Sequence, residues 1–336
     1  CKVILETYGE IALGPYGGLA VGQVANLDQA KLAQLVKDLF TEANVTTAQV
    51  SFSIPLRSSL LVILDLPDVG KSKLEKIVPI EARKYVPVPI SEVELDWWVI
   101  PSAAADHSVA EGDTADNEGG KGRVEVLLAA IHKDVLTQYQ EVAKLASLTP
   151  KFFEIETFSA IRSVFGGELS PTAIIDLGAA TSKLSIVDYG VVRLSHTISK
   201  GSQDITISIS RSLGIDFARA EEIKRQVGLV ERADGPDVGR VINTILEYIF
   251  AEVNKVMSIY QQKHRRSISK IVLIGSGSLM VGLLDLAKRS FEVPVTIGTP
   301  FDKSEYPAFL ENVLKNTGPG FAVAMGLALR QLEELN

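Results

Sequence analysis

IIDLGAATSKLSIV, residues 174–187, is the stretch of sequence that decides the fold. An apolar run ends on Asp176, a turn of small residues follows at 178–182, and a second β-rich segment starts at Lys183. Backbone N–H groups in such a turn can converge on an anion, and a carboxylate at a strand end can hold Mg²⁺ through water. The stretch therefore predicts a strand that leads through an anion-binding turn into a hairpin.

Two further segments have the composition of a nucleotide-binding site. KIVLIGSGSLMVGLLDLA, residues 270–287, predicts a strand, a glycine-rich turn and a helix, and its glycines allow a flat or anionic group to approach the backbone. AEEIKRQVG, residues 220–228, predicts a helix with Glu221 and Lys224 on one face. Each motif alone also fits a plain turn or a surface ion pair, so the interpretation depends on their order along the chain.

Around these motifs, strand-like and helix-like segments alternate, which predicts an α/β fold with a sheet covered by helices. The expected helices cover 30–42, 72–85, 133–147, 202–213, 217–226, 237–263 and 322–332. The expected strands cover 2–5, two pieces of 49–66, 93–100, 123–131, 151–155, 172–177, 183–188, 191–199 and 269–274. We expect Asp28 to cap the first helix, and Pro79 to kink or split the second because proline lacks a backbone donor. The small, acidic segment 103–122 is expected to be a mobile loop.

The composition excludes several classes of protein. A chain of 336 residues suggests about two domains. With 34 basic and 41 acidic residues, a net charge of −7 and a pI of about 5.3, it is not expected to bind nucleic acid. One cysteine permits no internal disulfide, and four histidines argue against a cysteine or histidine metal cluster. No apolar run approaches the ~20 residues that span a bilayer. We expect a cytoplasmic protein that reaches a membrane only through a partner.

The order of the three motifs resembles the second half of the actin-like ATPase fold. There, Asp-x-Gly-x-x-Thr/Ser before a hairpin is the second phosphate loop, Glu-x-x-Lys contacts the ribose, and strand-Gly-Ser-Gly-Ser-helix is the adenosine loop. Within that superfamily the chain resembles the PilM family of type IV pilus assembly over essentially its whole length. The segments that carry the resemblance are 77–100, 122–165, 174–187 and 320–330, with ARKYVPVPISEVELDW (82–97) the most diagnostic.

The resemblance implies a two-lobed fold like that of FtsA, with an α+β subdomain inserted in the first lobe. The implied parts are 1–46 (first lobe), 47–147 (inserted subdomain), 148–170 (return to the first lobe) and 171–336 (second lobe, with a helical subdomain at about 214–266). It also implies ATP and Mg²⁺ bound between the lobes. The implied partner is the N-terminal cytoplasmic peptide of the inner-membrane protein PilN, bound in a groove between the first lobe and the inserted subdomain.

The resemblance also assigns roles to residues that match the family motifs. Asp176 would position Mg²⁺ through water. The nucleotide contacts would be Gly178, Thr181 and Ser182 at the phosphates, Gly201 close to the phosphates, Glu221 and Lys224 at the ribose, and Gly275, Ser276 and Gly277 at the adenosine. Glu156 is the candidate catalytic residue that orients water, although a glutamate at a helix N-terminus can equally serve the helix dipole.

An aromatic and proline-rich cluster in the implied inserted subdomain could accept an apolar peptide. It consists of Tyr85, Pro87, Trp97 and Trp98. Because side chains alternate along a strand, we expect one tryptophan to lie in the core and the other to be partly exposed. Tyr85 and Trp97 are the candidate peptide contacts.

Three functions remain open from the sequence. The first is a nucleotide-responsive adaptor that docks PilN, contacts other inner-membrane pilus components and self-associates. The second is an active ATPase or a small-molecule kinase of the same fold, for which no substrate base is evident. The third is the cytoplasmic domain of the related type II secretion platform protein, whose membrane helix is not seen before Asn336. Family members also carry a strand and a first phosphate loop ahead of the segment that follows Cys1 here, so half of the phosphate clamp is expected to be missing.

Overall fold

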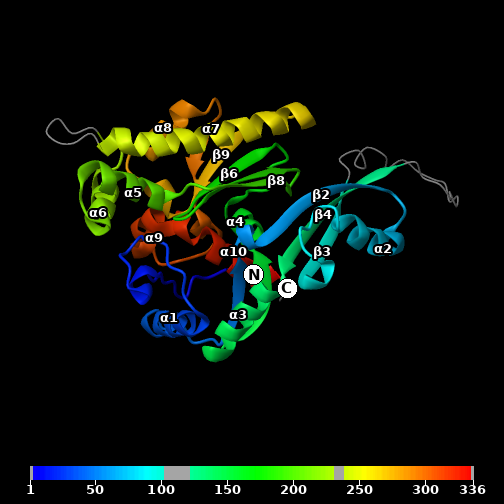
Figure 1. Ribbon diagram of the computed structural model, residues 1–336, viewed down its shortest axis with the longest axis horizontal. Coiled ribbons are helices and arrows are strands. Elements are labelled where there is room, and N and C mark those ends of the chain that lie inside the picture. The colour runs from blue at the N-terminus through cyan, green and yellow to red at the C-terminus, as the bar shows by residue number, and fades with distance from the viewer. Residues whose placement is uncertain (1–2, 102–121, 231–237, 334–336) are drawn as a thin grey trace. The chain divides into compact units, whose positions relative to one another are not determined.

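A computed structural model describes residues 3–101, 122–230 and 238–333 (Figure 1). The chain divides into two compact units. Unit 1 comprises Cys1–Ser53 and Tyr139–Asn336, and unit 2 comprises Ile54–Gln138. The loop predicted at 103–122 lies almost wholly outside the described residues.

A five-stranded sheet with the order β10-β9-β6-β7-β8 forms the centre of unit 1. Its strands are β6 (Thr172–Leu177), β7 (Ser182–Asp188), β8 (Val191–Ile198), β9 (Lys270–Ile274) and β10 (Val295–Ile297). β6 pairs with β7 in antiparallel and with β9 in parallel fashion, so Asp176 lies opposite Lys183 on one side and Ile274 on the other. The predicted strand, turn and hairpin are therefore confirmed.

Helices cover this sheet because its strands are apolar on both faces. The 27-residue α7 (Val238–His264) lies across one side, where its apolar stripe packs against β6, β7 and β9 (Figure 1). α4 (Glu156–Val164) and α10 (Ala322–Glu333) lie on the other side in that view. A Cβ at Gly326 would lie 1.7 Å from the Ser159 carbonyl oxygen, so α10 and α4 meet at backbone contact.

The remaining elements of unit 1 surround this core. They are α1 (Gln29–Glu42), β1 (Gln49–Ile54), β5 (Thr149–Ile155), α5 (Ser202–Leu213), α6 (Phe217–Val227), α8 (Leu283–Ser290) and α9 (Glu311–Thr317). β1 and β5 form a two-stranded sheet. Asp28 caps α1 as predicted, since its side chain accepts a hydrogen bond from the Lys31 amide.

Unit 2 is a three-stranded antiparallel sheet with one helix packed on it. The strands have the order β2-β4-β3. They are β2 (Ser59–Pro67), β4 (Arg123–His132) and β3 (Val93–Ile100), and the helix is α2 (Lys71–Ala82). Trp97 packs against the apolar core of this unit, whereas Trp98 is 37% exposed. The expected division between the two tryptophans is confirmed. α3 (Lys133–Leu145) then leads from unit 2 into unit 1.

One prediction about local structure is wrong. The strand expected at 2–5, of which residues 3–5 are described, is reduced to a single bridge between Ile4 and Glu305, because Glu305 lies between two 3-10 turns and offers no extended partner. Of the kink or split expected at Pro79, the split does not occur, since α2 continues to Ala82. Val78 and Ala82 are fully buried, and this packing offsets the one hydrogen bond that proline removes.

Among the described residues, no helix combines the length and the apolar character needed to cross a membrane.

Candidate nucleotide-binding site

The turn that follows β6 is tied to the start of α5 by backbone hydrogen bonds. The amides of Ser202 and Gln203 donate to the carbonyl oxygens of Gly178 and Ala179 at 2.9 and 3.0 Å. A Cβ at Gly201 would lie 2.3 Å from the Ala179 carbonyl oxygen, so only glycine permits this approach. The small residues of the turn thus allow the first residues of α5 to pack directly against the end of β6, where both can contact the same ligand.

The glycine-rich turn after β9 lies against the same strand end. Gly275 has a φ of 80°, and a Cβ there would lie 2.5 Å from Asp176 Oδ1. A Cβ at Gly277 would lie 2.6 Å from the Leu177 carbonyl oxygen. Two neighbouring parallel strands, β6 and β9, therefore deliver two backbone turns to one edge of the sheet.

A cavity of about 630 Å³ opens at this edge. Its volume is in the range of small-molecule sites. It is lined by 10–14, 21–25, 177–180, Ser202, Glu221, Arg225, Ser276 and Gly277. A second cavity of about 310 Å³ shares several of these residues and adds Lys224, Leu279, Met280, Asn316 and Thr317. The two together form one candidate ligand site within unit 1.

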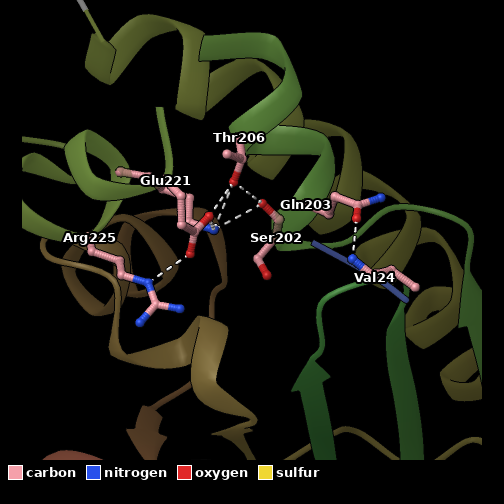
Figure 2. A network of polar contacts seen from close by, with 7 residues as sticks. Val24, Ser202, Gln203, Thr206, Glu221 and Arg225 are labelled. Atoms are coloured by element: carbon pink, nitrogen blue, oxygen red, sulfur yellow. Dashed lines mark hydrogen bonds and ion pairs between the residues drawn. The ribbon is translucent and has the colours of Figure 1, made fainter. Parts of the chain in front are cut away.

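The ion pair of Glu221 and Lys224 lines this site, and Figure 2 shows the polar contacts that Glu221 makes with Thr206 and Arg225. Lys224 Nζ lies 2.6 Å from Glu221 Oε2, and the two side chains are only 8% and 7% exposed. The Thr206 hydroxyl donates to Glu221 Oε2 at 2.6 Å, and Lys224 Nζ donates to Thr206 Oγ1 at 3.0 Å and to the Ser202 carbonyl at 3.2 Å. The pair is therefore an internal network that joins α6 to α5, in contrast to the surface pair that this spacing usually forms.

Burial and hydrogen bonding act on this pair in opposite senses. Burial alone would raise the pKa of Glu221, but the hydrogen bonds from Lys224 and Thr206 outweigh it and lower the pKa below its ordinary value. Burial lowers the pKa of Lys224, and its pairing with Glu221 only partly opposes this. Hydrogen bonding thus favours the ionised form of Glu221, whereas burial disfavours the ionised form of Lys224.

A third motif residue, Asp176, contacts a lysine. Lys183 Nζ lies 3.0 Å from Asp176 Oδ2 and 3.1 Å from Glu156 Oε2. The three side chains are between 14% and 18% exposed. Burial would lower the pKa of Lys183, but the carboxylates of Asp176 and Glu156 raise it.

Within the described ranges, no group of three or more His, Cys, Asp or Glu side chains could hold a metal ion. Asp176, which the resemblance assigns to Mg²⁺, is thus paired with an ammonium group of the chain itself.

Comparison with known proteins gives the family. Residues 5–332 match the sequence profile of the family described as "Type IV pilus assembly protein PilM". The chain belongs to the PilM family. A solved structure, described as a PilM-PilN type IV pilus biogenesis complex, superposes with a TM-score of 0.76 at 25% sequence identity, covering 92% of this chain and 86% of that chain.

More distant relatives are cell division proteins. FtsA of Neisseria meningitidis serogroup B is 23% identical, with 93% of this chain and 81% of the relative covered. FtsA of Pseudomonas aeruginosa is 24% identical, with 94% and 82% covered. The predicted α/β actin-like fold of the PilM type is confirmed by the family match and the structural likeness.

Most residues that the PilM resemblance selected come together at the cavity edge. Those that line the two cavities are Gly178, Glu221, Lys224, Ser276 and Gly277. Gly201 and Gly275 support the two turns, and the Thr181 carbonyl accepts a hydrogen bond from the Gly178 amide at 3.2 Å. Ser182 is fully buried beneath the turn, where its hydroxyl donates to the Lys200 carbonyl at 2.9 Å.

The other selected residues lie elsewhere. Glu156 is the first residue of α4, as predicted, and it contacts Lys183. Tyr85 and Trp97 belong to unit 2. Tyr85 is 47% exposed, whereas Trp97 is partly buried in the core of that unit.

Sequence reasoning missed an entire wall of the PilM-family site, the segment at 10–25. The amide of Val24 donates to Gln203 Oε1 at 2.5 Å. Gly22 has a φ of 86°, and a Cβ there would lie 2.6 Å from Glu221 Cδ. Arg225, whose Nε lies 2.7 Å from Glu221 Oε1, was also missed. The glycines of GEIALGPYGGLAVG (9–22) disfavour a strand and permit close packing, but they do not indicate that the segment packs against Glu221 of α6.

Proposed function

We propose that this PilM-family protein is an adaptor of type IV pilus assembly that binds ATP in the cavity of unit 1 and docks the N-terminal cytoplasmic peptide of PilN. Through PilN it is held at the inner membrane. The observation that carries the proposal is the convergence of three separate motifs of the family, from β6, α6 and β9, on one cavity.

Individual residues support ATP as the ligand. The turn at 178–181 and the start of α5 offer backbone donors to the phosphates, because such groups bind anions. The Glu221 and Lys224 pair offers an acceptor and a donor to ribose hydroxyls. Ser276 and Gly277 line both cavities, so a flat base can lie against this turn. Arg225, with 62% of its side chain exposed, adds a positive charge at the rim.

The proposal assigns no catalytic step to the chain. Glu156, the candidate for orienting water, already holds the Lys183 ammonium at 3.1 Å. A general base must be within hydrogen-bond reach of the proton that it removes. We therefore propose ATP as a bound ligand that stabilises a binding-competent protein rather than as a substrate in turnover.

The proposed partner rests on the family and on its solved relative. The relative's structure is described as a complex of PilM with PilN. Unit 2 carries exposed apolar side chains suited to a peptide, namely Tyr85 at 47%, Trp98 at 37% and Val99 at 39% exposure. We propose Tyr85 and Trp98 as the peptide contacts, since Trp97 packs against the apolar core of this unit.

Arg225→Ala tests the nucleotide site by calorimetry with ATP. Loss of one hydrogen bond to a charged group costs about 1.5 kcal/mol, or about a tenfold rise in Kd. Arg219→Ala is the matched control, because Arg219 lies on the same helix, is 58% exposed and pairs with Glu222 instead. Equal affinities for the two variants would place ATP outside this cavity, and no binding by the wild-type protein would refute the nucleotide half of the proposal.

A synthetic peptide of the PilN N-terminus tests the adaptor half. We expect saturable heat on titration into the folded protein, and weaker binding by Tyr85→Ala and Trp98→Ala. Tyr248→Ala is the control, since Tyr248 is 51% exposed but lies on α7 of unit 1. An absence of heat with well-folded protein would refute the docking function.

A further inference from the structure

We propose that the ammonium group of Lys183 takes the place of a divalent cation between Asp176 and Glu156, so that the chain holds ATP without a protein-bound Mg²⁺. That ATP binds here rests on the proposed function. The position of Lys183 between the two carboxylates does not, because it involves only side chains of unit 1.

The position of Lys183 follows from strand register. Asp176 and Lys183 are directly opposed residues of the antiparallel β6 and β7, so their side chains leave the same face of the sheet. Glu156 reaches the same point from the first turn of α4. One ammonium group on β7 thus lies within hydrogen-bond distance of two carboxylates, one on β6 and one on α4.

This arrangement excludes a metal at the same point. Mg²⁺ binds carboxylate oxygens at about 2.0–2.1 Å in a nearly octahedral shell. A cation bridging Asp176 and Glu156 would have to occupy the volume that now contains Lys183 Nζ, 3.0 and 3.1 Å from the two oxygens. A metal ion placed beside the Lys183 ammonium group would also be repelled strongly by it, because the site has little exposure to water. The metal and the ammonium are therefore alternatives.

Lys183 also supplies the positive charge that a bound metal ion would otherwise provide to the two carboxylates. Asp176 and Glu156 are 18% and 14% exposed, and two neighbouring carboxylates largely removed from water are unstable without a counter-ion. Lys183 supplies that charge from within the chain. Replacing the lysine by an unbranched, uncharged side chain that is one atom shorter should consequently open a cation site where the wild-type protein has none.

The test uses Mn²⁺ alone, without nucleotide, and follows binding by electron paramagnetic resonance. We expect no saturable Mn²⁺ binding to the wild-type protein or to Lys183→Arg, which keeps the positive charge. Lys183→Met should bind one Mn²⁺ at least roughly tenfold more tightly. Adding Asp176→Asn to Lys183→Met should abolish that binding. These outcomes together would identify Lys183 as the occupant of the metal position.

Two results would overturn the inference. One is a tight Mn²⁺ site in the wild-type protein that Asp176→Asn removes, because the metal would then displace the lysine. The other is a folded Lys183→Met variant, with native circular dichroism, that gains no site. If Lys183→Met does not fold, the wild-type titration with and without Asp176→Asn still decides the question, since the proposal requires both to lack the site.

The second measurement compares the dissociation constant of ATP in the presence of EDTA with that in the presence of Mg²⁺. The inference predicts dissociation constants for the wild-type protein that agree within about threefold. Binding that requires Mg²⁺ would contradict it. If ATP binds under neither condition, the proposed function fails, whereas the Mn²⁺ experiment continues to test Lys183 independently.

Discussion

Glu221→Gln is the substitution that tests the architecture of the cavity wall most severely. Glu221 holds Lys224, Arg225 and the Thr206 hydroxyl at 2.6 to 2.7 Å, and it joins α6 to α5. The amide of glutamine keeps the shape and one acceptor but removes the negative charge. Lys224 would then be an ammonium group with an 8% exposed side chain and no carboxylate at 2.6 Å.

The size of the effect follows from this burial. Removing one partner of a buried ion pair costs about 3–5 kcal/mol. We expect the lower end, about 3 kcal/mol, because Lys224 keeps its bonds to Thr206 and Ser202 and because burial already lowers its pKa. At about 2 °C per kcal/mol for a unit of this size, the melting temperature should fall by about 6 °C at neutral pH.

The assay is thermal unfolding followed by circular dichroism over a series of pH values. The pKa of Glu221 lies below its ordinary value of 4.5, so the pair stabilises the fold above that value and the contribution is lost as pH falls through the lowered pKa. The difference between Glu221→Gln and wild type should therefore shrink toward zero in acid. Glu222→Gln, on the exposed side of α6, is the control and should change little. An unchanged melting temperature for Glu221→Gln, or an equal loss in Glu222→Gln, would refute the reasoning.

Three other predictions concern packing and charge. Gly326→Ala should lower stability by several kcal/mol or prevent folding, since its Cβ would lie 1.7 Å from a carbonyl oxygen of α4, whereas Gly122→Ala, with 3.7 Å of room, should be tolerated in the same melting experiment. Trp97→Ala should cost about 3 kcal/mol and Trp98→Ala clearly less in chemical denaturation, because Trp97 packs in the core of unit 2; equal costs would contradict that placement. Glu154→Gln should lower the melting temperature at neutral pH, because two arginines share this buried carboxylate at 2.8 and 2.9 Å, and no change would contradict the network.

Local patterns predicted most elements because hydrophobic periodicity and caps act over a few residues. The apolar stripe of α7 and the cap of α1 by Asp28 are examples, and both are confirmed. The strand expected at 2–5 failed because a strand depends on a partner that may be remote in sequence, here near Glu305. The helix is not split at Pro79, because burial of Val78 offsets the local penalty.

The parts of the site that are continuous in sequence could be predicted from the sequence. Each turn at the ends of β6 and β9 could be found from its own glycines, and the sheet brings them together. The segment at 10–25 and the contact of Lys183 with Glu156 could not be found in this way. Both depend on which elements pack side by side, and Lys183 and Glu156 are 27 residues apart.

A crystal structure of the protein with ATP in the presence of EDTA would show directly whether ATP binds in this cavity without a metal. We expect density for the phosphates beside the turn at 178–181 and for the base beside 275–277. We also expect Lys183 Nζ to remain between Asp176 and Glu156. Nucleotide density outside this cavity, or an empty cavity at saturating ATP, would contradict the account.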